Sequence, residues 1–357
     1  MLWFVGTGIN GYRGLSIAAL DVLRKCDIVY IERFTSALSE ADLQGLNSLL
    51  KMHTKPVQRW FVEDGRELLE EARTKDIALV TYGDPLIATT HSELRSRAAK
   101  NSIKTAILHS ASGIASIIGE SGLHVYKFGR MVTMTSELHS AVTVYNTIFE
   151  NLLAGSHTLI LTEYSHNDES KEPLFLDPSS VFKMLLDAER AHKHQIFSDD
   201  TFAVVASRVG MQDQKIISGK VKSLMKLEFG IGPHSVIVTG SLHFTETQAL
   251  ASVTESIDEP TDNSQSVNRI EAQMVERYAP KAKQAVQEMR KFIIDGTDDS
   301  NKGIFETLEN AECYIADAER FLRQGKFELA VLSIGYAEGL IDALRYQKGI
   351  NPWNTPS

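Results

Sequence analysis

The segment Gly83-Asp84-Pro85 and the small residues at 88–90 are the part of this 357-residue sequence that most suggests chemistry. They follow the apolar run 76–81, which predicts a buried strand. Glycine lets a ligand approach the backbone, and proline stiffens the turn that presents the Asp84 carboxylate. The pattern predicts a turn that leaves room for a flat ligand beside an acid, although a plain capping turn has the same composition.

Two other predicted strand exits have the same small and polar character, GTGINGYRG at 6–14 and HSASG at 109–113. Ligands of open parallel sheets bind beyond the carboxyl ends of the strands. Taken singly, these motifs are weak: the GTG turn lacks the third glycine of a dinucleotide fingerprint, and no Walker sequence occurs. The serines at 110 and 112 are typical helix caps. The simplest interpretation of His109, His157 and His234 is that they are hydrogen-bonded structural histidines.

The surrounding elements predict an α/β architecture with an added helical part. Residues 1–130 alternate apolar strands with amphipathic helices, which indicates parallel βαβ units and a sheet covered on both faces. The pattern restarts over 131–251 and predicts a second α/β unit with a mixed sheet. Residues 252–266 have the polar, acidic composition of a linker. Three apolar stripes at helical spacing over 267–357 predict a small antiparallel bundle.

Composition excludes several classes of protein. Hydrophobic residues make up 43% and charged residues 23%, as in globular proteins, and the net charge of −9 argues against direct nucleic-acid binding. No apolar run approaches the roughly 20 residues of a membrane span, and the first residues, MLWFVGTG, have no basic region followed by a long apolar stretch, so no secretory signal is expected. Cys26 and Cys313 are interpreted as small core residues in a reducing compartment. We therefore expect a cytoplasmic protein with no membrane partner.

The order and separation of the motifs are more specific than any one of them. GTGI near the N-terminus, GDPLIATTH at 83–91, GLHVYKFGR at 122–130, SRVG at 207–210 and GPHS at 232–235 occur in that order. Together they resemble the diphthine synthases, a family of the tetrapyrrole-methylase-like superfamily, over residues 1 to about 250. The resemblance implies a two-domain class III methyltransferase fold. The tail resembles a helical domain of unknown function found in archaeal proteins, most clearly over 325–345.

The resemblance also implies an activity, a cofactor and a set of contacts. The family uses S-adenosylmethionine to methylate the amino group of a modified histidine on translation elongation factor 2, in diphthamide biosynthesis, usually as a homodimer. Its cofactor lies in the cleft between the two α/β domains. Carried over residue by residue, the cofactor contacts are Ile9, Asp84, Ile87, Ser112, Gly113, Glu163, Val209 and His234. The family commonly has Ser-Ile at 112–113 and Leu-Asp at 162–163, so Gly113 can offer only its backbone.

A methyl transfer of this kind needs little acid–base machinery. It is an in-line displacement at an activated carbon, so the protein must mainly align the reacting atoms and exclude water. Accordingly, no catalytic residue and no metal ligand is predicted. The attacking amine must be unprotonated, and we expect an acid-poor pocket that lowers the pKa of that amine by burial.

Two alternatives remain open from the sequence. The same fold could methylate a tetrapyrrole, a cobalamin or sirohaem precursor, whose carboxylates would require Arg and Lys in the site. A protein that only binds would need a cleft unable to hold the cofactor. The helical tail could be a self-contained or dimerising bundle, or a module that docks the elongation factor.

Overall fold

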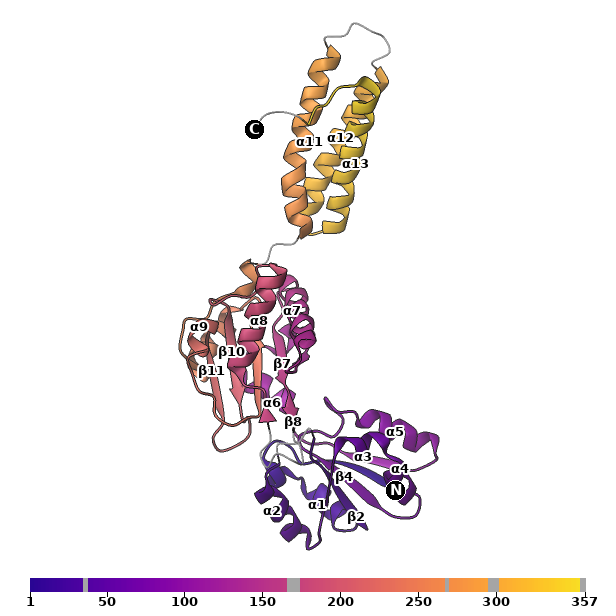
Figure 1. Ribbon diagram of the computed structural model, residues 1–357, viewed down its shortest axis with the longest axis vertical. Helices are drawn as coiled ribbons and strands as arrows, with labels where there is room; N and C mark the ends of the chain where they lie inside the picture. Colours follow the sequence, from indigo (N-terminus) through magenta and orange to yellow (C-terminus); the bar gives the residue numbers. More distant parts are fainter. Residues whose placement is uncertain (35–37, 166–173, 267–269, 295–301, 354–357) are drawn as a thin grey trace. The chain divides into compact units, whose positions relative to one another are not determined.

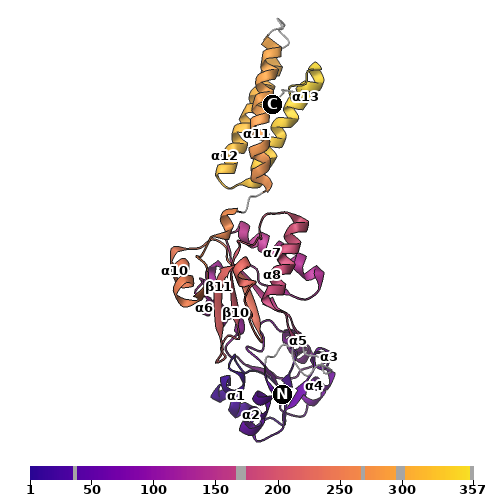
Figure 2. The same cartoon turned by 60° about the vertical axis from the view of Figure 1, so that its left-hand side comes forward.

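The computed structural model describes residues 1–34, 38–165, 174–266, 270–294 and 302–353. The chain divides into two compact units, Met1–Val267 and Asn268–Ser357, each of which is described by itself (Figure 1). The described part of the first unit contains two large sheets flanked by helices and a small two-stranded sheet, and that of the second contains helices only (Figure 2).

The first sheet is entirely parallel, in the order β3-β2-β4-β1-β5. Its strands are β1 (Leu2–Gly6), β2 (Ile28–Glu32), β3 (Lys55–Val57), β4 (Ile77–Thr81) and β5 (Thr105–Leu108). The 3-10 turn η1 (Gly11–Gly14) and the helices α1 (Ile17–Leu23), α2 (Glu40–Leu50), α3 (Arg59–Asp64), α4 (Arg66–Glu71) and α5 (His91–Lys100) connect them. Alternate β4 side chains point to opposite faces: Ala78 and Val80 pack with α1 and α2, whereas Ile77 and Leu79 pack with α3, α4 and α5. Helices therefore cover both faces, as the sequence predicted.

The second sheet is mixed, in the order β13-β11-β10-β12-β7-β6, which confirms the prediction. Its strands are β6 (Val132–Met134), β7 (Thr158–Thr162), β10 (Phe202–Ser207), β11 (Lys215–Lys220), β12 (His234–Val238) and β13 (Glu255–Ser256). The cores on its two faces are completed by α7 (Leu138–Leu153), α8 (Pro178–His192) and α9 (Val221–Leu224) on one side and by α6 (Gly113–Ser121) and α10 (Phe244–Val253) on the other. The short 3-10 helix η2 (Val125–Lys127) and the pair β8 (Tyr164–Ser165) and β9 (Leu174–Phe175) were not predicted.

The segment interpreted as a linker, 252–266, is attached to the second α/β half at two places, the short strand β13 and the turn at Asn263. Ser256 pairs with Ser218 of β11, and Asn263, in the 3-10 turn η3 (Asn263–Ser266), is buried. The Asn263 amide donates to the carbonyl groups of Phe202 and Thr239, both at 2.8 Å. Hydrogen bonds rather than apolar burial hold this stretch, so its polar composition looked like that of a free tether.

The second unit consists of α11 (Ile270–Ile294), α12 (Lys302–Arg323) and α13 (Phe327–Lys348), whose three predicted stripes share one core. The prediction of a helical bundle is thereby confirmed.

The prediction that both cysteines are core residues is wrong for one of them, since Cys26 is buried but Cys313 is exposed. Burial raises the pKa of the Cys26 thiol to about 11. No helix within the described ranges has the length and hydropathy to cross a bilayer.

Candidate functional site

A cleft of about 1000 Å³ lies within the first unit. One wall comes from the residues that follow β2, β3, β4 and β5, at the carboxyl ends of the parallel strands. The other wall comes from β6, the end of β7, and the start of β12. Because β12 runs antiparallel to β7, its residue Ser235 pairs with Leu161 and reaches the same edge. The volume is at the upper end of the range for ligand pockets.

The Asp84 turn forms part of the first wall, and its carboxylate is engaged inside the protein. The side chain is 6% exposed and accepts hydrogen bonds from the backbone N–H groups of Leu86 and Ser110 at 2.9 and 3.3 Å. His109 Nδ1 lies 2.8 Å from the same carboxylate and donates to it. Asp84 therefore joins the turn after β4 to the turn after β5, and it fixes the backbone that faces the cleft.

The glycines of the GTG turn make room for that Asp84 turn. Gly8 and Gly83 exchange two backbone hydrogen bonds, of 3.1 and 3.0 Å. A Cβ atom at Gly6 would lie 2.4 Å from the Gly83 carbonyl oxygen, and one at Gly8 would lie 2.9 Å from the Ser110 hydroxyl. Glycine is required here because two turns approach each other closely, so the motif supports the cleft rather than cradling a phosphate.

A fully buried histidine holds the turn from behind. His91 Nδ1 lies 2.9 Å from the Pro85 carbonyl oxygen, which can only accept, so Nδ1 carries the hydrogen. Its other ring nitrogen lies 3.4 Å from the carboxylate of Glu32, also fully buried. Thr89 donates to the same Pro85 carbonyl at 2.8 Å. Thr89 and His91 thus both donate to the Pro85 carbonyl, which accounts for their places in the motif.

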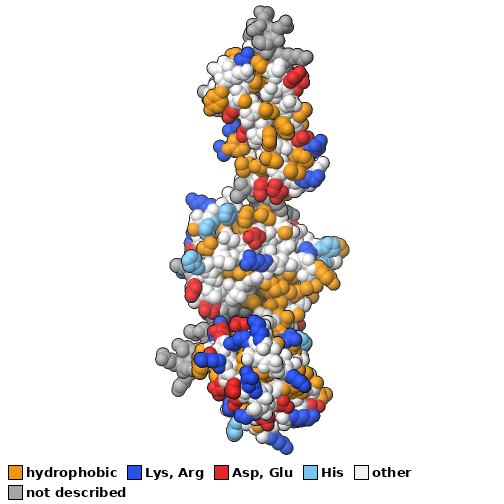
Figure 3. Space-filling model, turned by 90° about the vertical axis from the view of Figure 1, so that its right-hand side faces the viewer, with side chains coloured by type: hydrophobic (Ala, Val, Ile, Leu, Met, Phe, Trp, Pro, Cys, Tyr) orange, Lys and Arg blue, Asp and Glu red, His pale blue; other side chains and the backbone are white. Residues whose placement is uncertain are grey.

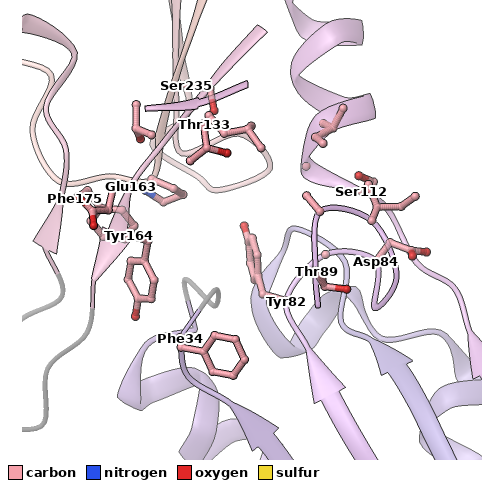
Figure 4. Close-up of a pocket in the computed structure, with 18 of the residues that line it drawn as sticks. Phe34, Tyr82, Asp84, Thr89, Ser112, Thr133, Glu163, Tyr164, Phe175 and Ser235 are labelled. Carbon is pink, nitrogen blue, oxygen red and sulfur yellow. The ribbon is translucent and has the colours of Figure 1, made fainter. Parts of the chain in front are cut away.

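Aromatic side chains line both walls of the cleft (Figure 4). Phe34 and Tyr82 come from the first wall, and Tyr164 and Phe175 come from the second, with ring centroids 4.9 Å apart. The Tyr82 hydroxyl donates to the Ile9 carbonyl at 2.9 Å, and burial raises its pKa to about 12. Tyr82 is thus a neutral side chain that braces the turn after β1. Flat aromatic surfaces suit a planar ring or an onium group.

The second wall carries polar groups that are also engaged in internal hydrogen bonds. Glu163 accepts from both the backbone and the hydroxyl of Ser136 at 2.8 Å. His234 is 4% exposed, and its Nε2 lies 3.3 Å from the Gly230 carbonyl, so Nε2 carries the hydrogen. Its Nδ1 then accepts from the Ser207 hydroxyl at 2.9 Å. Burial lowers the pKa of His234, and with both nitrogens engaged it is neutral and unsuited to act as a base.

Of the eight residues expected at the cofactor, six line the cleft, namely Asp84, Ile87, Ser112, Gly113, Glu163 and His234. Ile9 and Val209 lie beside it in a shared apolar cluster with the first turn of α6. A Cβ atom at Gly210 would lie 2.4 Å from the Ile9 side chain, so the two segments are in close contact. The structure therefore brings the turns after β4 and β5 together with Glu163 and His234 at the cleft, and the segments of Ile9 and Val209 pack beside them.

Several residues at the cleft were missed. They are Phe34, Arg59, Trp60, Tyr82, Thr133, Tyr164 and Phe175. Trp60 was hidden because β3 and α3 are short and carry no clear period, although its 70% exposure makes it notable in the structure. Tyr82 stands directly before the GDP turn, and its position at a strand exit was the one available signal.

The GLHVYKFGR segment contributes to a separate network centred on Glu246, which is fully buried. Lys127 forms an ion pair with Glu246, and His157 lies 3.0 Å from the same carboxylate. The backbone N–H groups of His124 and His243 also donate to it at 2.8 Å. Burial alone would raise the pKa of Glu246, but the hydrogen bonds from Lys127 and the two backbone groups outweigh it and lower that pKa to about 2.

Comparison with known proteins agrees with this architecture. Residues 1–225 match the model of the tetrapyrrole (corrin/porphyrin) methylases, and residues 277–350 match a protein family of unknown function, DUF357. A diphthine synthase from Methanocaldococcus jannaschii is 35% identical over 260 residues, 72% of this chain and 100% of that protein. A diphthine methyl ester synthase from Dictyostelium discoideum is 31% identical, covering 70% of this chain and 96% of its own. A crystal structure of diphthine synthase superposes with a TM-score of 0.63 at 28% identity, over 74% of this chain and 99% of that one.

With two α/β halves around a cleft at the strand ends, the chain belongs to the tetrapyrrole methylase family. It is a methyltransferase, and its methyl donor is S-adenosylmethionine. Within that family it groups with the diphthine synthases.

The cleft fits that donor chemically. The sulfonium is cationic, and three acidic residues, Glu63, Asp84 and Glu163, are among those that line the cleft. Gly113 presents its backbone with no atom within 4 Å of where a Cβ would lie, so the backbone there is open to close approach. No group of three or more potential metal ligands occurs among the residues that the structure describes.

Proposed function

We propose that this chain is a diphthine synthase that methylates the amino group of a modified histidine on translation elongation factor 2. We further propose that it does so as a homodimer in an archaeal cytoplasm, the setting that several of its relatives suggest. The support is the family membership together with the chemistry of the cleft.

The charges of the residues that line the cleft distinguish between the two substrate classes. Among the described residues that line it, Arg59 is the single Lys or Arg, and it is paired with Glu63 at 3.6 Å. A tetrapyrrole precursor carries several carboxylates, each of which would need a cationic partner on leaving water. Three acidic residues against one arginine instead favour a cationic donor and an amine acceptor. This observation weighs against the tetrapyrrole alternative.

In the proposed mechanism the protein supplies position rather than proton transfer. When bound, S-adenosylmethionine supplies a methyl group on a sulfonium leaving group. Asp84, Ile87, Ser112 and Gly113 would hold it from the first wall, and Glu163 and His234 from the second. Ile9 and Val209 support these loops from behind. The aromatic side chains would exclude water and hold the acceptor beside the donor.

The expectation of an acid-poor pocket is wrong, because Glu63, Asp84 and Glu163 all line the cleft. Nearby negative charge favours the ammonium form of an amine, whereas burial disfavours it. We therefore expect the rate at saturating substrate to keep rising through pH 8–9 as the acceptor loses its proton. Initial rates between pH 6 and 10 would measure this, and a plateau below pH 7.5 would show instead that the cleft lowers the amine pKa.

A reconstituted reaction tests the function directly. The purified chain is incubated with methyl-labelled S-adenosylmethionine and an archaeal elongation factor 2 carrying the unmethylated side chain. Mass spectrometry should show added methyl groups on the modified histidine. An elongation factor with that histidine replaced is the matched control, and uroporphyrinogen in place of the protein tests the alternative. Label on the porphyrinogen alone would overturn the proposal.

A further inference from the structure

Helix α13 carries apolar residues on two faces. Ala330, Ile334, Ala337, Ile341 and Leu344 are buried in the core of the second unit. Opposite them, Leu329, Leu332, Tyr336 and Tyr346 are 45%, 58%, 57% and 75% exposed. Hydrophobic side chains run along the second unit in Figure 3. A surface helix normally keeps one apolar stripe, and one that is apolar on both sides is typically covered on both sides.

The neighbouring helix shows the usual surface pattern. The exposed positions of α12 include Glu306, Glu309, Glu312 and Arg320. Both helices contribute to the same core, but among its described residues α12 exposes one large apolar side chain, Tyr314 at 37%, against the four of α13.

The exposed residues of α13 follow a heptad. Leu329, Leu332, Tyr336, Gly339, Ala343 and Tyr346 are separated by three and four residues in strict alternation, and all six are exposed. This spacing is that of a coiled-coil seam, which faces one partner helix along its length. The seam extends over about 26 Å of helix.

Two glycines in this face have no role in the bundle. Gly335 and Gly339 lie in the middle of α13, where glycine is unfavourable relative to alanine. A Cβ atom built on either one meets no atom within 4 Å. The fold of the single chain therefore does not require glycine at these positions. A second helix that approaches this face closely would require it.

The seam is complementary to itself in one orientation. When two α13 helices pair antiparallel about a two-fold axis between 337 and 338, the facing pairs are Leu329 with Tyr346, Leu332 with Ala343, and Tyr336 with Gly339. Two of these three layers then match a bulky side chain with a small one. A parallel pair would instead set Tyr336 against Tyr336 and Gly339 against Gly339. Tyr336 also stacks on Tyr314 at 5.4 Å, which fixes its ring.

The charges at the ends of the helix agree with the antiparallel pairing. The first turn of α13 carries Glu328, and its last turn carries Arg345 and Lys348. Antiparallel pairing places the acidic turn of one copy beside the basic turn of the other at both ends, and it also opposes the two helix dipoles.

We propose that α13 is a homodimerisation helix, and that the seam of one chain packs antiparallel against the same seam of a second copy. Of the alternatives for the tail, the proposal favours a dimerising bundle over a module that docks the elongation factor. The proposal concerns the second unit alone and is independent of the substrate of the methylase unit.

Disulfide trapping in the full-length protein tests the pairing and its direction. In a Cys313→Ser background, one protein carries Leu332→Cys and another carries Ala343→Cys. In the antiparallel pair each position lies about 16 Å along the axis from itself in the other copy, beyond the 7 Å that a disulfide allows between Cα atoms. We expect oxidation of the mixture, but of neither protein alone, to give a covalent dimer.

The control is the same experiment on α12 with Glu309→Cys and Arg320→Cys, which are also eleven residues apart and exposed. This mixture should give no more dimer than random collision. Absence of a covalent dimer in the α13 mixture would overturn the proposal. Efficient crosslinking of Leu332→Cys with itself would overturn the antiparallel direction.

A second variant tests the layer of Tyr336. Adding Gly339→Leu to the cysteine proteins should lower the crosslinking yield at least tenfold, because leucine fills the space that Tyr336 of the second copy would occupy. Helix content by circular dichroism should stay the same, since nothing in the single chain contacts that position. An unchanged yield would show that the layer is misassigned. Dimerisation through the methylase unit would contribute equally to the α12 and α13 mixtures, so the difference between the two mixtures reports on the α13 pairing.

Discussion

The two most distinctive motifs of the sequence have different roles in the structure. GDPLIATTH, at 83–91, lines the cleft and has its backbone fixed by Asp84 and His91. GLHVYKFGR, at 122–130, contributes no residue to the cleft wall and instead supplies Lys127 to the buried Glu246 network. The comparison teaches that a recognisable motif can mark either where chemistry occurs or where a buried charge must be neutralised.

The largest effect should come from breaking the Glu246 network. Lys127→Met leaves the fully buried Glu246 carboxylate without its cationic partner. Such a change costs about 3–5 kcal/mol of unfolding free energy. Urea denaturation measures the loss, and the KM for S-adenosylmethionine of the folded fraction should not change, because Lys127 does not line the cleft.

The matched control removes the charge as well. Lys127→Met combined with Glu246→Gln should recover part of the stability, because no uncompensated charge then remains buried. If the double variant is as unstable as the sum of the single ones, the two residues do not interact as the structure indicates.

Lowering the pH should reduce the unfolding free energy through the same Glu246 network. The folded pKa of Glu246 is lowered to about 2, below its ordinary value of 4.5. A lowered pKa contributes stability that is present above pH 4.5 and is lost as the pH falls towards 2, by no more than about 3 kcal/mol. Comparing unfolding free energies of the wild type and Glu246→Gln between pH 6 and 2 measures this contribution. Parallel curves for the two proteins would refute it.

At the other motif, Asp84→Ala should weaken S-adenosylmethionine binding by about 1–3 kcal/mol. The loss is expected because the carboxylate organises the backbone of two loops that line the cleft. Calorimetric titration of the folded variant measures it. Asp84→Asn is the control, since an amide oxygen can still accept from the Leu86 N–H and should retain part of the affinity. Unchanged binding in Asp84→Ala would leave the residue as a turn-former only.

The fold could be predicted to a large extent because its signals are local. Burial can be predicted from residue type in two places. These are β4, which is apolar at most positions and buried at every one, and the three apolar stripes of the bundle. Residues 255–266 could not be placed, because the amide of Asn263 holds them through hydrogen bonds that leave no periodic pattern. Hydrogen bonds between distant residues are invisible to composition.

The candidate site was predicted only where loops have glycine or a family motif. Asp84 and His234 were found in this way, but the aromatic side chains were not. Phe34, Tyr164 and Phe175 meet at the cleft because separate strands end at the same edge, and nothing in their neighbouring residues shows this. Glu246 was likewise missed, since its partner Lys127 is 119 residues away along the chain.

The smallest effect on stability is expected at Tyr126, the exposed neighbour of Lys127 in GLHVYKFGR. Tyr126 is 97% exposed, whereas the adjacent Lys127 reaches into the Glu246 network. Tyr126→Ser should therefore change the unfolding free energy by less than about 0.5 kcal/mol, as is usual for surface positions without buried partners. Urea denaturation beside Lys127→Met would show a difference of several kcal/mol between neighbouring residues. A loss above 2 kcal/mol in Tyr126→Ser would mean that the whole segment, and not only its buried lysine, stabilises the unit.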